Sequence, residues 1–417
     1  MRHVRTHAWA LLATVSVALG ASPALAIQSG ASGPAAISGD TNPQGTPVGP
    51  SSGDDTNPQQ APSGPPPPGG ITVRPGLDIT YGGEVATKLQ VDGAFVRGQR
   101  NFAEPFNKTI GTGYVNLGES FAVRGEVTLE RFKAQSATTA FNGEGLSLSQ
   151  LYGVYSFGPV FAYAGKIHPR FSVGYEQAPG LYDTFANDYE QKERIGFGAL
   201  VRIFPGLGRH FLSAETYFLD TSVLSQSILA RPSVDNPATL RPGRLRRYQG
   251  GPSNTGNFSS YDVALDGSLI PGLERLRYHL GFTQEGVSQP GEKQETGATA
   301  FLSYSILLTP RITMTPLVEV ATFRNFAGVA GEDRTYVIGA AEFEYRRWTL
   351  SFLDATRRVR ANDVGQGGSS RWDNQFNATL TRRIAPRLFA SVGYNHIRDT
   401  GQVSDTVSVA LDYALRF

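Results

Sequence analysis

Hydrophobic and polar residues alternate without interruption over residues 404–417, the end of the chain. One face of this stretch carries large apolar side chains at every second position: Val407, Val409, Leu411, Tyr413, Leu415 and Phe417. The other face is small or polar. Side chains of a strand point alternately to the two sides of a sheet, and about ten such residues can cross the apolar layer of a membrane. The pattern predicts a C-terminal strand, and its length favours a membrane β-barrel over a soluble sheet.

The same period recurs upstream, between tight turns that repeat about every 38 residues. The turns lie at 118–119, 158–159, 205–206, 271–272, 309–310, 346–347 and 385–386. Most of them contain proline, which cannot sit inside a hydrogen-bonded ladder. A unit of this length fits two strands, one short turn and one longer loop, so the seven turns predict about sixteen strands, within a range of about fourteen to eighteen. An even number places both chain ends on the side of the short turns, which is periplasmic in such barrels.

The predicted fold class is therefore all-β, a transmembrane antiparallel β-barrel. Strands are expected at about 83–97, 110–117, 121–132, 146–157, 160–169, 193–204, 209–220, 258–269, 274–285, 295–308, 311–323, 334–345, 347–357, 371–384, 387–398 and 404–417. The alternation of the fourth strand is irregular between Leu146 and Leu148, which suggests a bulge. Residues 71–81 have no assigned place and could form an extra strand.

The polar faces of these strands carry charges that are expected to point into the barrel, including Arg124, Glu126, Arg275 and Arg277. Sixteen strands enclose a space too wide to be filled by their own side chains. The sequence therefore predicts a water-filled lumen lined by charges. Aromatic residues beside the short turns are expected on the lipid-facing side: Phe121, Phe157, Phe161, Tyr345, Trp348 and Phe417.

The N-terminus has the three parts of a secretory signal. Arg2 and Arg5 precede a short apolar stretch, 8–19, and Ala24 and Ala26 mark a cleavage site, so residues 1–26 are expected to be removed. No other stretch approaches the roughly 20 apolar residues of a membrane-spanning helix. The chain has no cysteine, and its 38 basic and 36 acidic residues nearly balance, which argues against a nucleic-acid partner.

Residues 27–70 differ from the rest of the chain in composition. They are rich in Gly, Pro and Ser, lack Lys and Arg, and carry only Asp40, Asp54 and Asp55 as charges. Such a segment cannot bury a core, so we expect it to be disordered and periplasmic. It is either a spacer or a contact with a periplasmic partner. The barrel domain is expected to occupy 71–417.

In its signal sequence, its C-terminal strand and the position of its long loops, the chain resembles the general diffusion porins of bacterial outer membranes. The resemblance covers 71–417. It implies a Gram-negative outer-membrane pore for the passive diffusion of small hydrophilic solutes and ions, in contact with lipid and lipopolysaccharide and assembled as a homotrimer. It also implies that Tyr413, Leu415 and Phe417 form the signal read by the barrel-assembly machinery.

In that family the loop between the fifth and sixth strands folds into the barrel and narrows it. Here this loop carries the acids Glu176, Asp183, Asp188 and Glu190. Basic residues frame it: Lys166, His168, Arg170, Lys192 and Arg194. The spacing of Lys166, His168 and Arg170 predicts that all three face inward from the fifth strand. Opposed charges across a constriction would create a transverse field that orients dipolar solutes. A solvated surface loop, or a salt-bridge network without a role in transport, remains the alternative.

Other functions are left open. A channel selective for one class of solute, or a transporter for apolar molecules, would share this pattern. There is a weaker resemblance to the phosphate-selective porins, but the chain has few lysines for their basic ladders. A barrel enzyme such as a phospholipase would need a catalytic histidine, and His168, His210, His279 and His396 are the candidates. Without a recognisable catalytic motif, we expect no enzyme activity, no cofactor and no metal.

Overall fold

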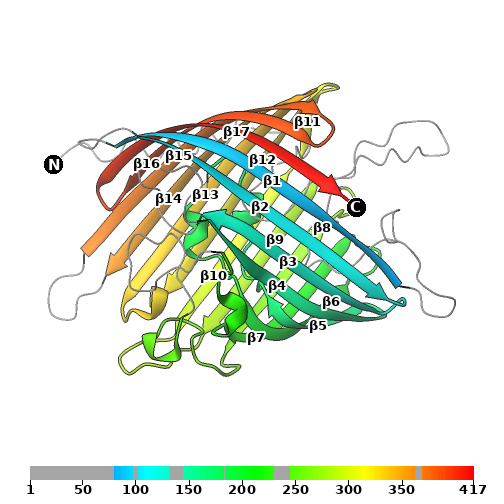
Figure 1. Cartoon of the computed structure of the whole chain (residues 1–417), viewed down its shortest axis with the longest axis vertical. Helices are drawn as coiled ribbons and strands as arrows, with labels where there is room; N and C mark the ends of the chain where they lie inside the picture. Colours follow the sequence, from blue (N-terminus) through cyan, green and yellow to red (C-terminus); the bar gives the residue numbers. More distant parts are fainter. Residues whose placement is uncertain (1–78, 97–101, 132–143, 183, 230–244, 362–368) are drawn as a thin grey trace.

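The computed structural model describes residues 79–96, 102–131, 144–182, 184–229, 245–361 and 369–417. They form one antiparallel sheet that closes on itself, because β1 pairs with both β2 and β17 (Figure 1). β10 and β11 are two parts of one strand, separated at Ser305, and both pair with β12. Counted in this way, the barrel has sixteen strands, and the predicted fold class is confirmed.

The strands are β1 Ile79–Val96, β2 Phe102–Leu117, β3 Phe121–Arg131, β4 Glu144–Phe157, β5 Val160–Ile167, β6 Arg194–Ile203, β7 Arg209–Leu219, β8 Ser260–Ser268, β9 Leu276–Glu285, β10 Glu295–Tyr304, β11 Ile306–Thr309, β12 Ile312–Arg324, β13 Glu332–Tyr345, β14 Trp348–Ala361, β15 Ser369–Ala385, β16 Leu388–Asp399 and β17 Gln402–Arg416. Helical segments are confined to loops: α2 Gly174–Gln177, η2 Phe185–Asp188, η3 Val223–Ser225, η4 Arg247–Gln249 and η5 Phe326–Gly328. Among the described residues, no helix is long and apolar enough to cross a membrane.

The alternation of apolar and polar residues in the sequence matches the alternation of outward-facing and inward-facing side chains in the barrel wall. From Val407 to Leu415 of β17 every second residue is exposed, and the residues between them are buried. The same holds in β3, where Arg124 and Glu126 point inward. Gly83 lies at the seam of the barrel, where β1 meets β17. Gly83 and Phe417 exchange two backbone hydrogen bonds, and a side chain at position 83 would collide with the Phe417 ring.

The first two strands differ from the prediction. β1 begins at Ile79, so 79–81 belong to it, and β2 begins at Phe102 instead of at about 110. Residues 107–109 of β2 are polar on both faces, which hides the two-residue period. The bulge in β4 is confirmed, because Glu126 pairs with Gln150 but Val127 pairs with Leu148, which leaves Ser149 without a partner position. The expected signal sequence and the segment 27–70 lie outside the described residues.

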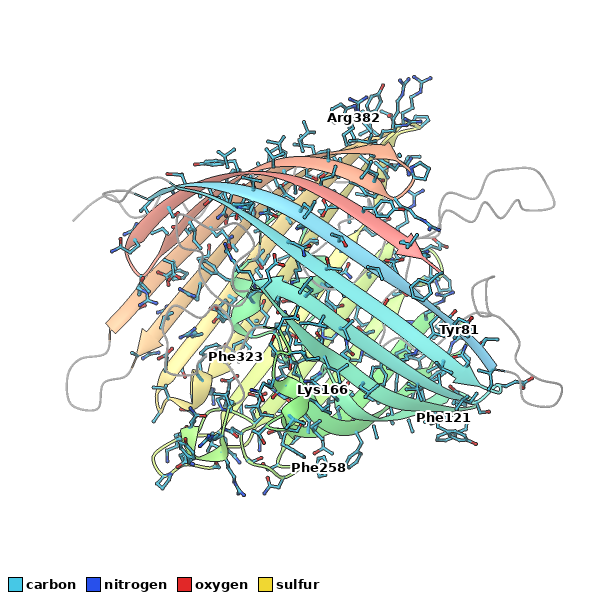
Figure 2. All side chains as sticks on the ribbon, viewed as in Figure 1. Tyr81, Phe121, Lys166, Phe258, Phe323 and Arg382 are labelled. Atoms are coloured by element: carbon cyan, nitrogen blue, oxygen red, sulfur yellow. The ribbon has the colours of Figure 1, made fainter. Side chains whose placement is uncertain are left out.

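One predicted lipid-facing aromatic points the other way. Phe161 pairs with Leu200, which is 1% exposed, and packs against the buried Tyr152 and Val154 on the inner side of β4. Phe121, Phe157, Tyr345 and Trp348 are exposed, as expected for a lipid-facing position, and Figure 2 labels Phe121 at one end of the barrel. Apart from Lys166, β5 has small or apolar residues on both faces, so its period does not reveal which face points inward.

Candidate functional site: the loop inside the barrel

Loop L3, residues 168–193, leaves β5 and enters the barrel instead of extending from it. Its first contact is made by Arg170, whose Nη2 donates to Oδ2 of Asp266 on β8 at 2.7 Å. His279 on β9 holds the same carboxylate through Nδ1, at 2.8 Å, and reaches the carbonyl oxygen of Phe171 through Nε2, at 3.0 Å. Both partners accept hydrogen bonds, so a protonated imidazole, which donates from both nitrogens, matches them.

A second anchor is the buried carboxylate of Glu319 on β12. It accepts hydrogen bonds from three groups of L3: the Ser172 hydroxyl at 2.9 Å, the Gly174 backbone N–H at 2.7 Å and the Tyr189 hydroxyl at 2.7 Å. Only glycine fits at 174, because a Cβ there would lie 2.1 Å from a Glu319 oxygen. The three donors satisfy a charge that would otherwise be costly to bury.

An apolar cluster joins L3 to the inner side of β12–β14. The loop contributes Phe171, Tyr175, Phe185, Ala186 and Tyr189, and the wall and its loop contribute Ala321, Phe323, Phe326, Tyr336, Ile338, Leu353 and Ala355. Ring centroids of Phe171 and Phe323 are 5.4 Å apart, and those of Tyr189 and Tyr336 are 4.8 Å apart. We call this surface, on β12–β14, the apolar wall. Its inward residues are hydrophobic because L3 covers them.

Asp188 belongs to the docking contacts of the loop. Its carboxylate accepts from Arg357 Nη1 at 2.8 Å and from the Tyr336 hydroxyl at 2.9 Å. Arg357 also binds Asp373 on β15 and lies 4.6 Å over the ring of Phe185. These contacts tie Asp188 to the apolar wall, whereas the sequence had suggested a place among the constriction acids. Asp183 lies outside the described residues.

The tip of L3 reaches the opposite part of the wall. The Leu181 backbone N–H donates to Thr379 Oγ1 on β15 at 3.2 Å, and the Tyr182 hydroxyl donates to the Thr406 carbonyl on β17 at 3.2 Å. Lys88 on β1 approaches the Leu181 carbonyl at 3.5 Å. Because its base contacts β8 and β9 and its tip contacts β15, β17 and β1, the loop crosses the barrel.

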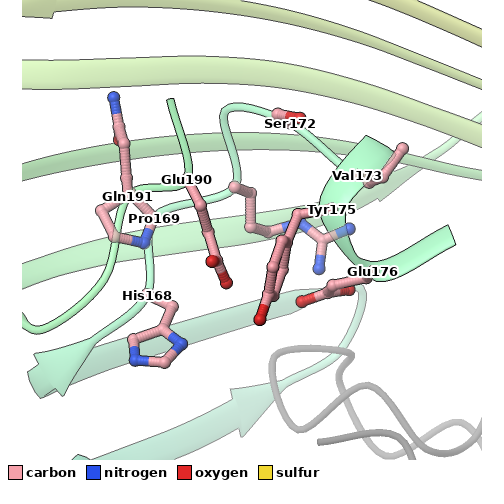
Figure 3. A pocket seen from close by; sticks show the side chains of 9 residues that line it. His168, Pro169, Ser172, Val173, Tyr175, Glu176, Glu190 and Gln191 are labelled. Atoms are coloured by element: carbon pink, nitrogen blue, oxygen red, sulfur yellow. The ribbon is translucent and has the colours of Figure 1, made fainter. Parts of the chain in front are cut away.

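The remaining charges of L3 gather around one pocket. Glu176, Glu190, His168 and Arg170 line it, and Figure 3 shows the carboxylates of Glu176 and Glu190 converging with the Tyr175 hydroxyl on the same space. Burial raises the pKa of Glu190 to about 7, against the opposing effect of the neighbouring Lys192. Burial also raises the pKa of Glu176.

Charges on β2 and β3 face this part of the loop. Glu126 is close enough to interact with Lys192 and Glu176, Lys108 with Glu190, and Glu130 with Lys192. We call the inner side of β2–β4 the polar wall. Arg124 lies on it beside Glu126, facing inward. Charges of both signs occur on the loop and on the polar wall.

The prediction for Lys166 is also wrong. Lys166 pairs with Leu151, which is 42% exposed on the outer side of β4, so its side chain starts on the outer side of the barrel. Residues 220–225 cover it. Its side chain is 1% exposed, and its Nζ contacts Glu193 Oε2 at 2.8 Å, Asp220 Oδ2 at 2.9 Å and the Leu224 carbonyl at 3.1 Å. The sequence analysis assigned the inward face of β5 one residue out of phase, and this single error gave the wrong orientation for both Lys166 and Phe161.

The other sequence-predicted residues have separate places. Arg194 faces inward and binds Glu285 on β9 at 3.3 Å. Arg277 faces inward near the short turns, and Arg275 is exposed just before β9 begins. Sequence analysis missed Glu319, Asp266 and Arg357, which hold the loop. The one signal in the sequence for a covered inner surface was the run Tyr336-Val337-Ile338, where both faces of a strand are apolar.

Comparisons with known proteins bear on the fold. The sequence matches no family model, and no curated protein matches it. Among solved structures, the outer-membrane channel DcaP of Acinetobacter baumannii aligns with a TM-score of 0.55 at 12% identity, over 83% of this chain and 99% of DcaP. OmpF of Salmonella typhi, solved with daunomycin, aligns with a TM-score of 0.53 at 8% identity, over 82% of this chain and 98% of OmpF.

This chain has the fold of the outer-membrane channels. At these identities the likeness is one of architecture, and individual residues do not correspond. The roles of the residues of L3 and of both walls therefore rest on the contacts within this barrel.

Proposed function

We propose that the protein is an outer-membrane porin that lets small hydrophilic solutes and ions diffuse through a water-filled pore. The observation that carries the proposal is the position of L3: it is docked on the apolar wall and presents Glu176, Glu190 and Lys192 toward the polar wall. The pore then runs between L3 and β2–β4, and the charges on its two sides set its ion preference. The porin and channel fold of the structural neighbours supports this function.

The same proposal covers the rest of the chain. Residues 1–26 direct export and are removed, 27–70 stay in the periplasm, and Tyr413, Leu415 and Phe417 guide insertion by the assembly machinery. Three copies form the working unit, as in other porins. Mass spectrometry of the exported protein would find Ile27 at its N-terminus, and deletion of Phe417, which pairs with Gly83 at the seam, would reduce the assembled fraction.

The test is conductance of the refolded protein in a planar bilayer under a salt gradient. We expect stable ohmic steps. Replacing both Glu176→Gln and Glu190→Gln should shift the reversal potential toward anion preference, whereas Glu274→Gln, an exposed acid in a short turn, should not. If the double variant gives conductance steps with the same ion selectivity as the parent, the protein is a pore but L3 does not form its constriction. A folded barrel without conductance would favour the alternatives, a closed transporter or a barrel enzyme.

A further inference from the structure

Two neighbouring short turns are strongly basic. The turn from β13 to β14 and the turn from β15 to β16 lie side by side, because β14 pairs with β15. Their arginines are Arg346, Arg347, Arg382, Arg383 and Arg387, and we call this group the arginine turns. Residues 345–350 and 378–390 contain no Asp or Glu. The charge therefore accumulates on one sector of the rim, and Glu344, just before the first turn, is the nearest acid in sequence.

Part of this charge is stacked on aromatic rings that face the lipid. Tyr345 pairs with Trp348, and Trp348 pairs with Arg382, so the three side chains lie in one row on the outer side of the sheet. The Arg382 guanidinium lies 5.0 Å from the Trp348 ring, and that of Arg346 lies 5.2 Å from the Tyr345 ring. Figure 2 shows Arg382 among side chains that project from this end of the barrel.

The backbone gives a second, independent observation. Arg346 has a φ of 57° and Arg387 a φ of 68°, in the left-handed region where glycine is the favoured residue. In the turns after β2 and β4 this region is occupied by Gly118 and Gly158, and in the turns after β6 and β8 Phe204 and Leu269 adopt it as well. An arginine in this conformation carries a strain that a glycine would not.

The arginines of this outer row have no acidic partner within the described part of the chain. Arg346, Arg382 and Arg387 form no ion pair with another described residue. The nearest acid, Glu344, faces inward and interacts with Arg383. Stacking fixes one face of a guanidinium and leaves its N–H edges available for two hydrogen bonds to a phosphate.

We propose that Arg346 and Arg382 of the arginine turns bind the phosphate groups of anionic phospholipid in the leaflet at this end of the barrel. Tyr345 and Trp348 are each 41% exposed, and Leu350 and Phe352 follow on the same outer face of β14. Aromatic rings of this kind sit at headgroup level, with the apolar residues beyond them in the hydrocarbon. Arg346 and Arg382 then lie at the depth of the phosphates. The inference requires a bilayer around the barrel but does not depend on conductance.

Trp348 reports on the lipid beside it. The chain has three tryptophans, and Trp9 lies in the segment proposed to be removed, so Trp372→Phe leaves Trp348 as the single one in the exported protein. This variant is reconstituted in phosphatidylcholine vesicles. One set contains brominated phosphatidylglycerol, and a second contains the same fraction of brominated phosphatidylcholine. We expect the brominated anionic lipid to quench Trp348 more strongly, since each arginine near a surface enriches anionic lipid about fivefold.

The double variant Arg346→Gln and Arg382→Gln should remove this excess while quenching by brominated phosphatidylcholine stays the same. Arg202→Gln with Arg275→Gln, two exposed arginines near other short turns, is the matched control and should change nothing. Equal quenching by both lipids in the parent protein would overturn the proposal, as would an excess that survives the double variant. Loss of the excess on adding inorganic phosphate would identify a site for free anions instead. A barrel without conductance that keeps the excess would overturn the porin function and leave this site in place.

Discussion

The inner surface of the barrel differs between the apolar wall and the polar wall. On β12–β14 the inward positions include Phe323, Tyr336 and Ile338, and L3 covers them. On β2 and β3 the inward positions include Lys108, Glu126 and Glu130, whose charges interact with those of the loop. One wall therefore positions L3. In the pore proposed above, the other wall and the exposed side of L3 line the path of the solute, so the position of the loop and the selectivity of the pore should be separable by substitutions on different strands.

Phe323→Ala should have the largest effect, because it removes the ring at the centre of the apolar wall. Phe323 is 2% exposed and contacts the rings of Phe171, Tyr189, Phe326 and Tyr336. A buried Phe→Ala change costs about 3–5 kcal/mol, which would loosen the loop. We expect a larger and noisier single-channel conductance and a lower unfolding temperature. Phe282→Ala, on the lipid side of β9, is the matched control, and equal conductance in the two variants would contradict a docked loop.

Glu319→Gln should have a smaller effect of the same kind. The amide keeps one acceptor oxygen but turns an NH₂ group toward donors from L3, so about 1.5–3 kcal/mol of charge-assisted hydrogen bonding is lost. We expect more frequent conductance fluctuations with little change in the mean. Asp354→Asn, a carboxylate on the outer side of β14, serves as the control. If both variants fluctuate as the parent does, Glu319 does not hold the loop.

The sequence predicts one wall well and the other poorly, for a physical reason. Where the inner side meets water, as in β3 and β17, the two faces differ in polarity and the two-residue period gives the orientation of each side chain. Where the inner side meets a loop, as in β13, both faces are apolar and the period disappears. The place of L3 in the chain could be predicted from loop length. Its anchors Asp266 and Glu319 could not, since their partners lie 96 and 147 residues away in sequence.

Short strands are the second case in which the two-residue period fails to predict the orientation of side chains. β5 has eight residues, Val160–Ile167, and apart from Lys166 its side chains are apolar or small on both faces, so little contrast in polarity sets its phase. One wrong phase moved Lys166 from the outer side to the lumen and Phe161 from the lumen to the lipid. The burial of Lys166 under residues 220–225 adds a tertiary contact that no local pattern contains.

On the polar wall, Glu126→Gln should change selectivity without releasing the loop. Glu126 is close to Lys192 and Glu176, and removing its charge alters the pore field at that point. An interaction of about 1 kcal/mol corresponds to about a fivefold change in the cation-to-anion permeability ratio, toward anions. Reversal potentials measure the ratio, and single-channel traces check that noise stays at the parent level. An increase in noise would mean that the polar wall also holds the loop, and the division between the two walls would be lost.

The smallest expected effect is a change of selectivity with pH. Burial raises the pKa of Glu190 to about 7, so Glu190 is charged well above pH 7 and neutral well below it. Cation preference should therefore fall as the pH drops through about 7. A raised carboxyl pKa also means that the folded loop binds this proton more tightly than an unfolded one, so the contribution of Glu190 to stability is present at low pH and is lost as the pH rises through about 7. Reversal potentials across this range should show the transition, and Glu190→Gln should flatten it. A transition centred near the ordinary value of 4.5 would instead place Glu190 in open water, on a loop not held against the wall.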